Sequence, residues 1–161
     1  MVFSAHEILD IAIRLEKNGE TIYRDASKKV RDPNLSLLLE WMADEEARHA
    51  RWFSKMRSRL ILESPDPQTA KMGRDMLDNL LAGQSFSLEE IDFGRIDHIN
   101  SMLATFIEFE KDTILFYQML EAFIQEEPVL AELKKIVAEE KRHIEKLKTL
   151  RHREAPATPT G

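Results

Sequence analysis

The sequence of 161 residues contains no cysteine and only five glycines. Without cysteine the chain cannot form disulfides, thiolate metal sites or iron–sulfur clusters, and thiol catalysis is excluded. No apolar run approaches the roughly 18 residues of a membrane-spanning helix, so we expect no membrane partner. The N-terminus lacks a basic segment followed by an apolar stretch. We therefore expect no signal peptide and a cytoplasmic location.

Neither sign of charge dominates the sequence. It has 23 Lys and Arg residues against 29 Asp and Glu residues, for a net charge of −6, and the two signs are interleaved. This balance argues against nucleic acid as a main partner. The length fits one domain. Few glycines and β-branched residues, with abundant Leu, Glu, Lys, Arg and Met, favour an all-α chain.

Apolar residues recur at steps of three and four over four long stretches. This period predicts helices at about 5–29, 34–62, 97–124 and 128–150. Short turns join the first helix to the second and the third to the fourth, which predicts two antiparallel hairpins. These hairpins correspond to half-repeats at 5–62 and 97–150, within one domain at 1–150. We expect the tail at 151–161 to be disordered.

The two hairpins are connected by a long crossover at about 63–96. It contains a predicted short amphipathic helix at 68–81. A connection of this length can return along the molecule and start the third helix at the opposite end. One long crossover between two hairpins is the arrangement of a ferritin-like four-helix bundle, and we predict that fold.

The two halves of the sequence carry the same motif in matched positions. A shift of 94 residues superimposes them without a gap. In each half a glutamate is followed by a tyrosine seven residues later and by a Glu-x-x-His pair thirty residues later. The matched residues are Glu16, Tyr23, Glu46 and His49 in the first half and Glu110, Tyr117, Glu140 and His143 in the second.

The repeated glutamates interrupt otherwise apolar helix faces, so we expect them to be buried. Buried carboxylates are normally paired or bound to metal. In each hairpin the two glutamates lie at similar distances from the turn. They therefore reach nearly the same height along the helix axes. We expect all four to meet in one shared site at the middle of the bundle. Two divalent ions would balance four carboxylates. Oxygen and imidazole ligands without sulfur suit iron or manganese, with zinc as an alternative. The predicted ligands are Glu16, Glu46, His49, Glu110, Glu140 and His143.

Several polar residues close to the predicted ligands have other roles. Glu45 and Glu139 directly precede predicted ligands but lie off the apolar faces, so we predict that both are helix-surface residues. Glu20 lies one turn after the first predicted ligand and either contacts the ligands from outside or is solvated. Tyr23 and Tyr117 either form hydrogen bonds to the ligands or belong to the ordinary core.

The paired motifs resemble the rubrerythrin-like branch of the ferritin-like superfamily, over about residues 5–150. The resemblance implies a centre of two iron ions that reacts with peroxide or dioxygen, and a homodimer. It also implies roles for the six residues. Glu16, Glu46, Glu110 and Glu140 would be carboxylate ligands, with Glu46 and either Glu140 or Glu110 as bridges, and His49 and His143 would each bind one iron.

Two features differ from classical rubrerythrins. Those proteins carry a small domain with a four-cysteine iron site, and they carry a glutamate where this chain has Thr113. Electrons would therefore come from an external donor or from ferrous iron. The leading prediction is an oxidoreductase that reduces peroxide or dioxygen. The alternatives are ferrous iron oxidation coupled to iron storage or delivery, and a metal-stabilised interaction module without redox activity.

Overall fold

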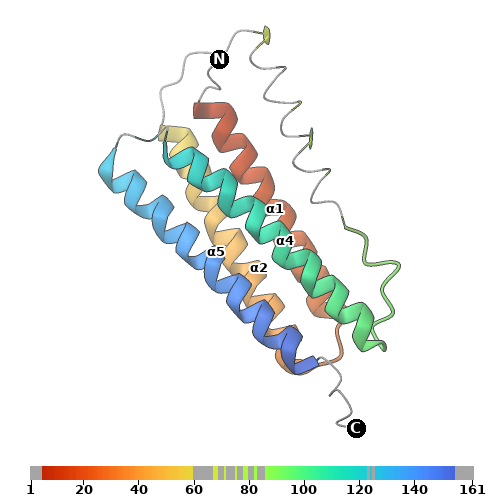
Figure 1. Ribbon diagram of the computed structural model, residues 1–161. Helices are drawn as coiled ribbons and strands as arrows, with labels where there is room; N and C mark the ends of the chain where they lie inside the picture. The colour runs from red at the N-terminus through yellow and green to blue at the C-terminus, as the bar shows by residue number, and fades with distance from the viewer. Residues whose placement is uncertain are drawn as a thin grey trace. The chain divides into compact units, whose positions relative to one another are not determined.

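The computed structural model describes residues 5–59, 67–68, 71, 75, 78–79, 82, 86–122, 124 and 126–154. Over these ranges the long elements are all helices, and no strand is present (Figure 1). They are α1 (Ala5–Lys29), α2 (Pro33–Arg59), α4 (Ile96–Glu121) and α5 (Glu127–Glu154). The all-α prediction is confirmed. None of the described helices combines the length and the apolar character needed to cross a bilayer.

The start of α2 is determined by Asp32 and Pro33. The carboxylate of Asp32 accepts a hydrogen bond from the backbone N–H of Asn34 at 3.0 Å. The backbone carbonyl of Asp32 accepts another from Ser36 at 2.9 Å. An aspartate that caps the free N–H groups, followed by proline at the first helical position, is a favourable helix start. The helix therefore begins one residue earlier than predicted.

The later helix bounds differ from the prediction at three points. Helix α4 ends at Glu121, three residues before the predicted end. Helix α5 begins at Glu127 and continues to Glu154, so 151–154 are helical and do not belong to a disordered tail. Residues 155–161 lie outside the described residues. The predicted crossover helix also lies largely outside them, although Gln68 and Lys71 within it are helical.

The chain divides into two compact units. The first unit comprises 1–28 and 37–86, and the second comprises 29–36 and 87–161. In the first unit, Asp10 near the start of α1 forms an ion pair with Arg57 near the end of α2. Arg24, late in α1, forms one with Asp44, earlier in α2, at 2.9 Å. These contacts show that α1 and α2 are antiparallel, as predicted.

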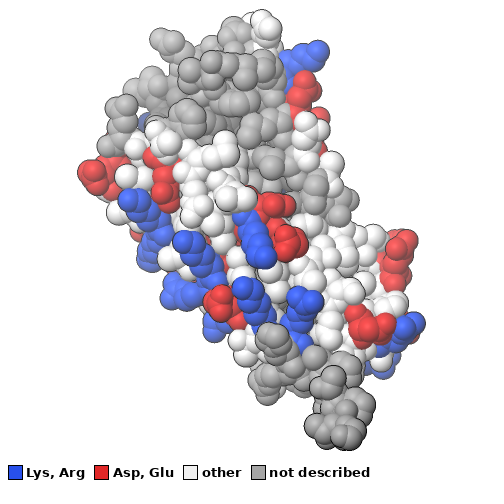
Figure 2. Space-filling model, viewed as in Figure 1, with Lys and Arg blue, Asp and Glu red and all other residues white. Residues whose placement is uncertain are grey.

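In the second unit α4 packs along α5. Most of the buried side chains of both helices are apolar. The outer face of α5 carries lysine and arginine (Figure 2). Burial of apolar surface is the main stabilising contribution to such a hairpin. The most deeply buried side chains of this unit include Met102, Leu103, Phe106, Leu133, Ile136 and Leu147. The corresponding side chains of the first unit include Ile11, Ala12, Leu39, Met42 and Phe53.

Candidate metal centre

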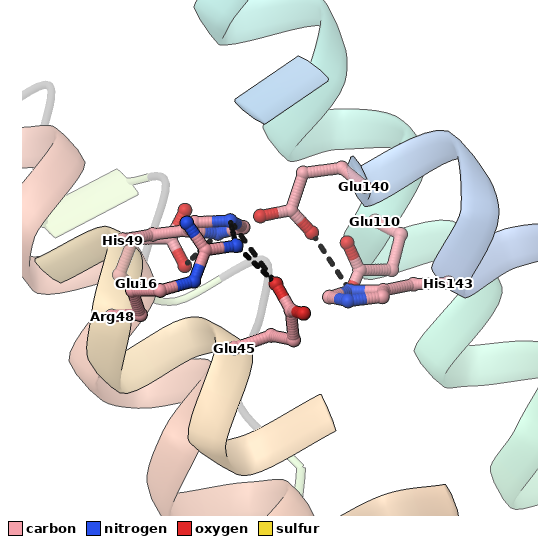
Figure 3. A network of polar contacts seen from close by, with 7 residues as sticks. All are labelled: Glu16, Glu45, Arg48, His49, Glu110, Glu140 and His143. Carbon is pink, nitrogen blue, oxygen red and sulfur yellow. Dashed lines mark hydrogen bonds and ion pairs between the residues drawn. The ribbon is translucent and has the colours of Figure 1, made fainter. Parts of the chain in front are cut away.

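The first unit brings three predicted ligands together. Glu16 comes from α1, and Glu46 and His49 come from α2; their exposed fractions are 0%, 3% and 0%. Nδ1 of His49 lies 3.4 Å from Oε2 of Glu16 (Figure 3). One ligand atom from each of the three residues lies within 4.8 Å of the others. The predicted burial and the predicted equal height of the two glutamates are therefore confirmed in this hairpin.

A glycine on α1 makes room for one of these carboxylates. A Cβ atom built on Gly19 would lie only 3.1 Å from Oε2 of Glu46. No role was assigned to Gly19 from the sequence. The sequence feature that could have indicated a role is the glycine itself, because glycine inside a long helix is unfavourable relative to alanine.

The second unit repeats the arrangement with Glu110 from α4 and Glu140 and His143 from α5. Nδ1 of His143 lies 3.4 Å from Oε1 of Glu110 and 3.0 Å from Oε2 of Glu140 (Figure 3). All three side chains are buried. One ligand atom from each again lies within 4.8 Å of the others. The two hairpins thus build matching clusters of two carboxylates and one imidazole.

The second cluster holds protons strongly when it contains no metal. Burial, and next the charge of Glu140, raise the pKa of Glu110 above its ordinary value. Burial alone would lower the pKa of His143, but hydrogen bonds to Glu110 and Glu140 outweigh it and raise that pKa to about 10. The protein therefore offers these two carboxylates too little positive charge to keep both ionised. In the metal-free cluster, protons supply the missing positive charge. A bound metal cation would supply it equally.

The donor atoms fit a transition-metal ion. Each cluster offers carboxylate oxygens and an imidazole nitrogen within the space of one coordination sphere. Iron and manganese accept this combination, and zinc also accepts it. Because the carboxylates are withdrawn from water, a divalent ion between them would offset charge that burial otherwise penalises. In this way the residues present fit a metal at each cluster.

The predicted surface role was wrong for Glu139, whereas Glu45 combines a surface ion pair with a contact to His49. Glu139 is buried, with 7% of its surface exposed. Glu45 is only partly exposed, and its Oε2 lies 3.7 Å from Nε2 of His49. Arg48 forms an ion pair with Glu45 and places Nη2 3.5 Å from the same His49 nitrogen. Both glutamates directly precede a predicted ligand at matched positions of the repeat. This match was the sequence feature that could have indicated their place beside the clusters.

The two tyrosines of the repeat, Glu20 and Thr113 are the remaining residues that were singled out from the sequence. Tyr23 and Tyr117 are both buried, at 3% and 0% exposure, which is consistent with either of their predicted roles. Glu20 forms an ion pair with Arg24 at 3.4 Å, and about a third of its side chain is exposed. It belongs to none of the metal-competent clusters found among the described residues. Thr113, where classical rubrerythrins carry a glutamate, is buried.

Comparison with known proteins agrees with this geometry. A family model described as Rubrerythrin matches residues 7–151. The chain belongs to the rubrerythrin family. The match includes all six predicted ligands of this family member and both of its Glu-x-x-His pairs. The metal-binding roles of the individual residues stay predictions.

A solved structure is similar to this rubrerythrin-family chain over nearly its whole length. It is a candidate ferritin-like diiron-carboxylate protein from Thermotoga maritima. The two chains share 25% sequence identity with a TM-score of 0.66, and 94% of this chain and 97% of the other are covered. The likeness confirms the predicted ferritin-like four-helix bundle as the fold class. No curated protein matches the sequence.

Proposed function

We propose that this rubrerythrin-family protein binds two iron ions, one at each cluster of two glutamates and a histidine, and reduces peroxide or dioxygen. The observation that carries the proposal is the repetition of the cluster. Two hairpins independently bury the same three side-chain types with the same 3.4 Å separation between an imidazole Nδ1 and a glutamate oxygen. A single buried histidine–glutamate contact has many structural explanations, whereas two matched ones in this family point to metal.

Iron bound at the clusters would supply the electrons that reduce the oxidant and the positive charge that orients it. The protein's own residues would hold the metals and control protons. Glu16, Glu46, Glu110 and Glu140 provide negative charge in a buried setting, and His49 and His143 provide neutral nitrogen donors. The pKa of about 10 at His143 means that this cluster releases a proton when metal binds at neutral pH.

The electrons have to be replaced after each turnover. The sequence contains no cysteine with which to build a rubredoxin-type iron site. We therefore infer that a separate electron donor reduces the centre, or that ferrous iron is itself consumed. The homodimer and the cytoplasmic location expected from the sequence also stay predictions. The single site shared by both hairpins, which the sequence predicts, also stays a prediction.

Peroxide consumption by iron-loaded protein tests the proposal. Protein loaded anaerobically with ferrous iron should consume hydrogen peroxide or dioxygen and oxidise the iron. The Glu46→Ala and Glu140→Ala variants should lose most of this activity, because each removes a ligand from one cluster. Glu145→Ala is the matched control, since Glu145 lies on the exposed face of α5, where it forms an ion pair with Lys148. Activity that persists in both cluster variants contradicts the proposal.

Iron counting separates this function from iron storage. A redox centre binds about two iron ions per chain, whereas a storage protein accumulates many per assembly. Elemental analysis of protein purified without added metal identifies the native metal. If zinc fills the clusters and no redox activity follows iron loading, the protein is instead a metal-stabilised interaction module.

A further inference from the structure

Gly19 lies in the interior of α1 and faces the carboxylate of Glu46 on α2. A Cβ at this position would be 3.1 Å from Oε2 and 3.3 Å from Cδ of Glu46. These separations are shorter than an ordinary contact between a methyl group and a carboxylate. Any residue larger than glycine would therefore require the carboxylate to move by a few tenths of an ångström.

The backbone does not explain why glycine occupies this position. No described glycine has a positive φ angle, so Gly19 adopts a conformation that alanine adopts equally well. Helix α1 extends from Ala5 to Lys29, well beyond Gly19 on both sides. Inside a helix glycine is less favourable than alanine because it loses more conformational entropy on folding. The physical reason left for glycine is the space that it leaves to Glu46.

We propose that Gly19 is a positioning residue for Glu46. Its lack of a side chain lets the Glu46 carboxylate lie against the α1 backbone, beside Glu16 and His49. The consequence for metal binding rests on the proposed function, because it requires Glu46 to be a ligand. The contact between Gly19 and Glu46 does not depend on that function.

Displacing this carboxylate is costly because it has little room to move. Glu46 is 3% exposed, and protein interiors are closely packed. A methyl group at residue 19 would turn Oε2 away from the point where the ligand atoms converge. Ligand distances in metal sites fall within about 0.2 Å of their characteristic values, so a displaced oxygen fits the site poorly. We therefore expect a substantial loss of metal affinity from the addition of one methyl group.

Anaerobic titration with manganese(II) tests this expectation with the Gly19→Ala variant. The affinity at one of the two metal sites should fall by about tenfold or more, the range seen when residues that position ligands are altered. Thr21→Ala is the matched control, since Thr21 is exposed on the same helix and its hydroxyl donates a hydrogen bond to the backbone carbonyl of Lys17. The control should bind manganese as the wild type does. Unchanged affinity in Gly19→Ala overturns the proposal.

A double substitution tests whether the effect acts through Glu46. Aspartate is shorter by one methylene, so Glu46→Asp withdraws the carboxylate from residue 19. Glu46→Asp should reduce affinity strongly in the wild type and markedly less in the Gly19→Ala background. Two sites in direct contact should show such non-additivity. Strictly additive losses overturn the proposal.

Metal-free protein separates this inference from the proposed function. If Gly19→Ala folds poorly, Glu46→Asp should restore its unfolding temperature; failure to restore it means that residue 19 serves general packing and overturns the proposal. If the wild type binds no metal, the proposed function fails. A crystal structure of metal-free Gly19→Ala then still tests whether Gly19 positions the Glu46 carboxylate. A displaced Glu46 carboxylate supports the positioning role, and an unmoved one overturns it.

Discussion

Nδ1 of His49 lies 3.4 Å from Oε2 of Glu16, and the two side chains come from opposite helices of the first hairpin. His143 and Glu110 reproduce the relationship in the second unit at the same distance. In both pairs the histidine directs Nδ1 toward the predicted ligand atoms. On His49 the other nitrogen, Nε2, lies 3.7 Å from Oε2 of Glu45, which can orient the imidazole ring.

Replacing one histidine should remove one metal. Each unit holds its own cluster, so His49→Ala or His143→Ala alone should lower the metal content from about two ions per chain to about one. Elemental analysis after anaerobic loading and desalting measures this content. His98→Ala is the control, because His98 accepts a hydrogen bond from the backbone of Asp92 outside both clusters. A count of two in either cluster variant contradicts the assignment.

The metal-free protein should lose stability as the pH rises. Folding raises the pKa of Glu110 through burial and the charge of Glu140, and it raises the pKa of His143 to about 10. A group with a raised folded pKa contributes stability that is fully present below its unfolded pKa and is lost as pH rises through the folded value. The free energy of unfolding should therefore fall between about pH 5 and about pH 10, by on the order of 1 kcal/mol or more.

Urea unfolding at a series of pH values measures this dependence. A Glu110→Gln and His143→Gln double variant removes both groups and should flatten the profile. Added manganese should reverse the trend, because the metal competes with protons for the same atoms and binds more tightly at high pH. Metal-free protein that becomes more stable from neutral to alkaline pH would contradict the assignment of these protons.

Glu45→Gln should weaken metal binding in the first unit. The Glu45 carboxylate lies near Nε2 of His49 and is held by Arg48. A carboxylate at this nitrogen favours a proton on Nε2 and leaves Nδ1 free to bind metal. The neutral amide should reduce the affinity by about tenfold.

Isothermal titration with manganese(II) measures the effect of Glu45→Gln. Glu145→Gln is the control, because its ion pair with Lys148 is exposed. If both variants bind as the wild type does, Glu45 has no role in orienting His49.

Truncation of the α4 core should be strongly destabilising. Leu103 is fully buried, so Leu103→Ala removes packed methyl groups and leaves a cavity, at a cost of about 2–5 kcal/mol. Leu115 on the same helix is 61% exposed. Leu115→Ala should change the free energy of unfolding by less than about 0.5 kcal/mol. Thermal or urea unfolding distinguishes the two, and equal losses would contradict the observed burial.

Much of the fold follows from local patterns in the sequence. The apolar period predicted α1 with its observed bounds and α2 with a start one residue late. The end of α4 and the extent of α5 were less accurate. The apolar pattern of the third helix continues to Ile124, but the structure ends that helix at Glu121. Helix ends depend on competing local hydrogen bonds, which periodicity does not report.

The candidate ligands could also be predicted, because their spacing is a one-dimensional property. Glu16 and Glu46 had to meet once α1 and α2 formed an antiparallel hairpin, and the 94-residue repeat required the same of Glu110 and Glu140. Glu139 shows where this reasoning fails. It lies off the apolar stripe of its own helix, yet it is buried. The pattern of one helix cannot show which of its polar residues other segments will cover.

The sequence by itself determined the helices, the pairing within each hairpin and the three residues that each hairpin brings together, because helical geometry converts spacing into height and direction. The tertiary structure decided three further features: the place of Gly19 against Glu46, the contact of Glu45 with His49, and the strong hold of His143 on its proton. Each of these depends on distances of a few ångströms between atoms on different turns or different helices. Such distances, and the withdrawal of charge from water that accompanies them, arise only when the side chains pack together.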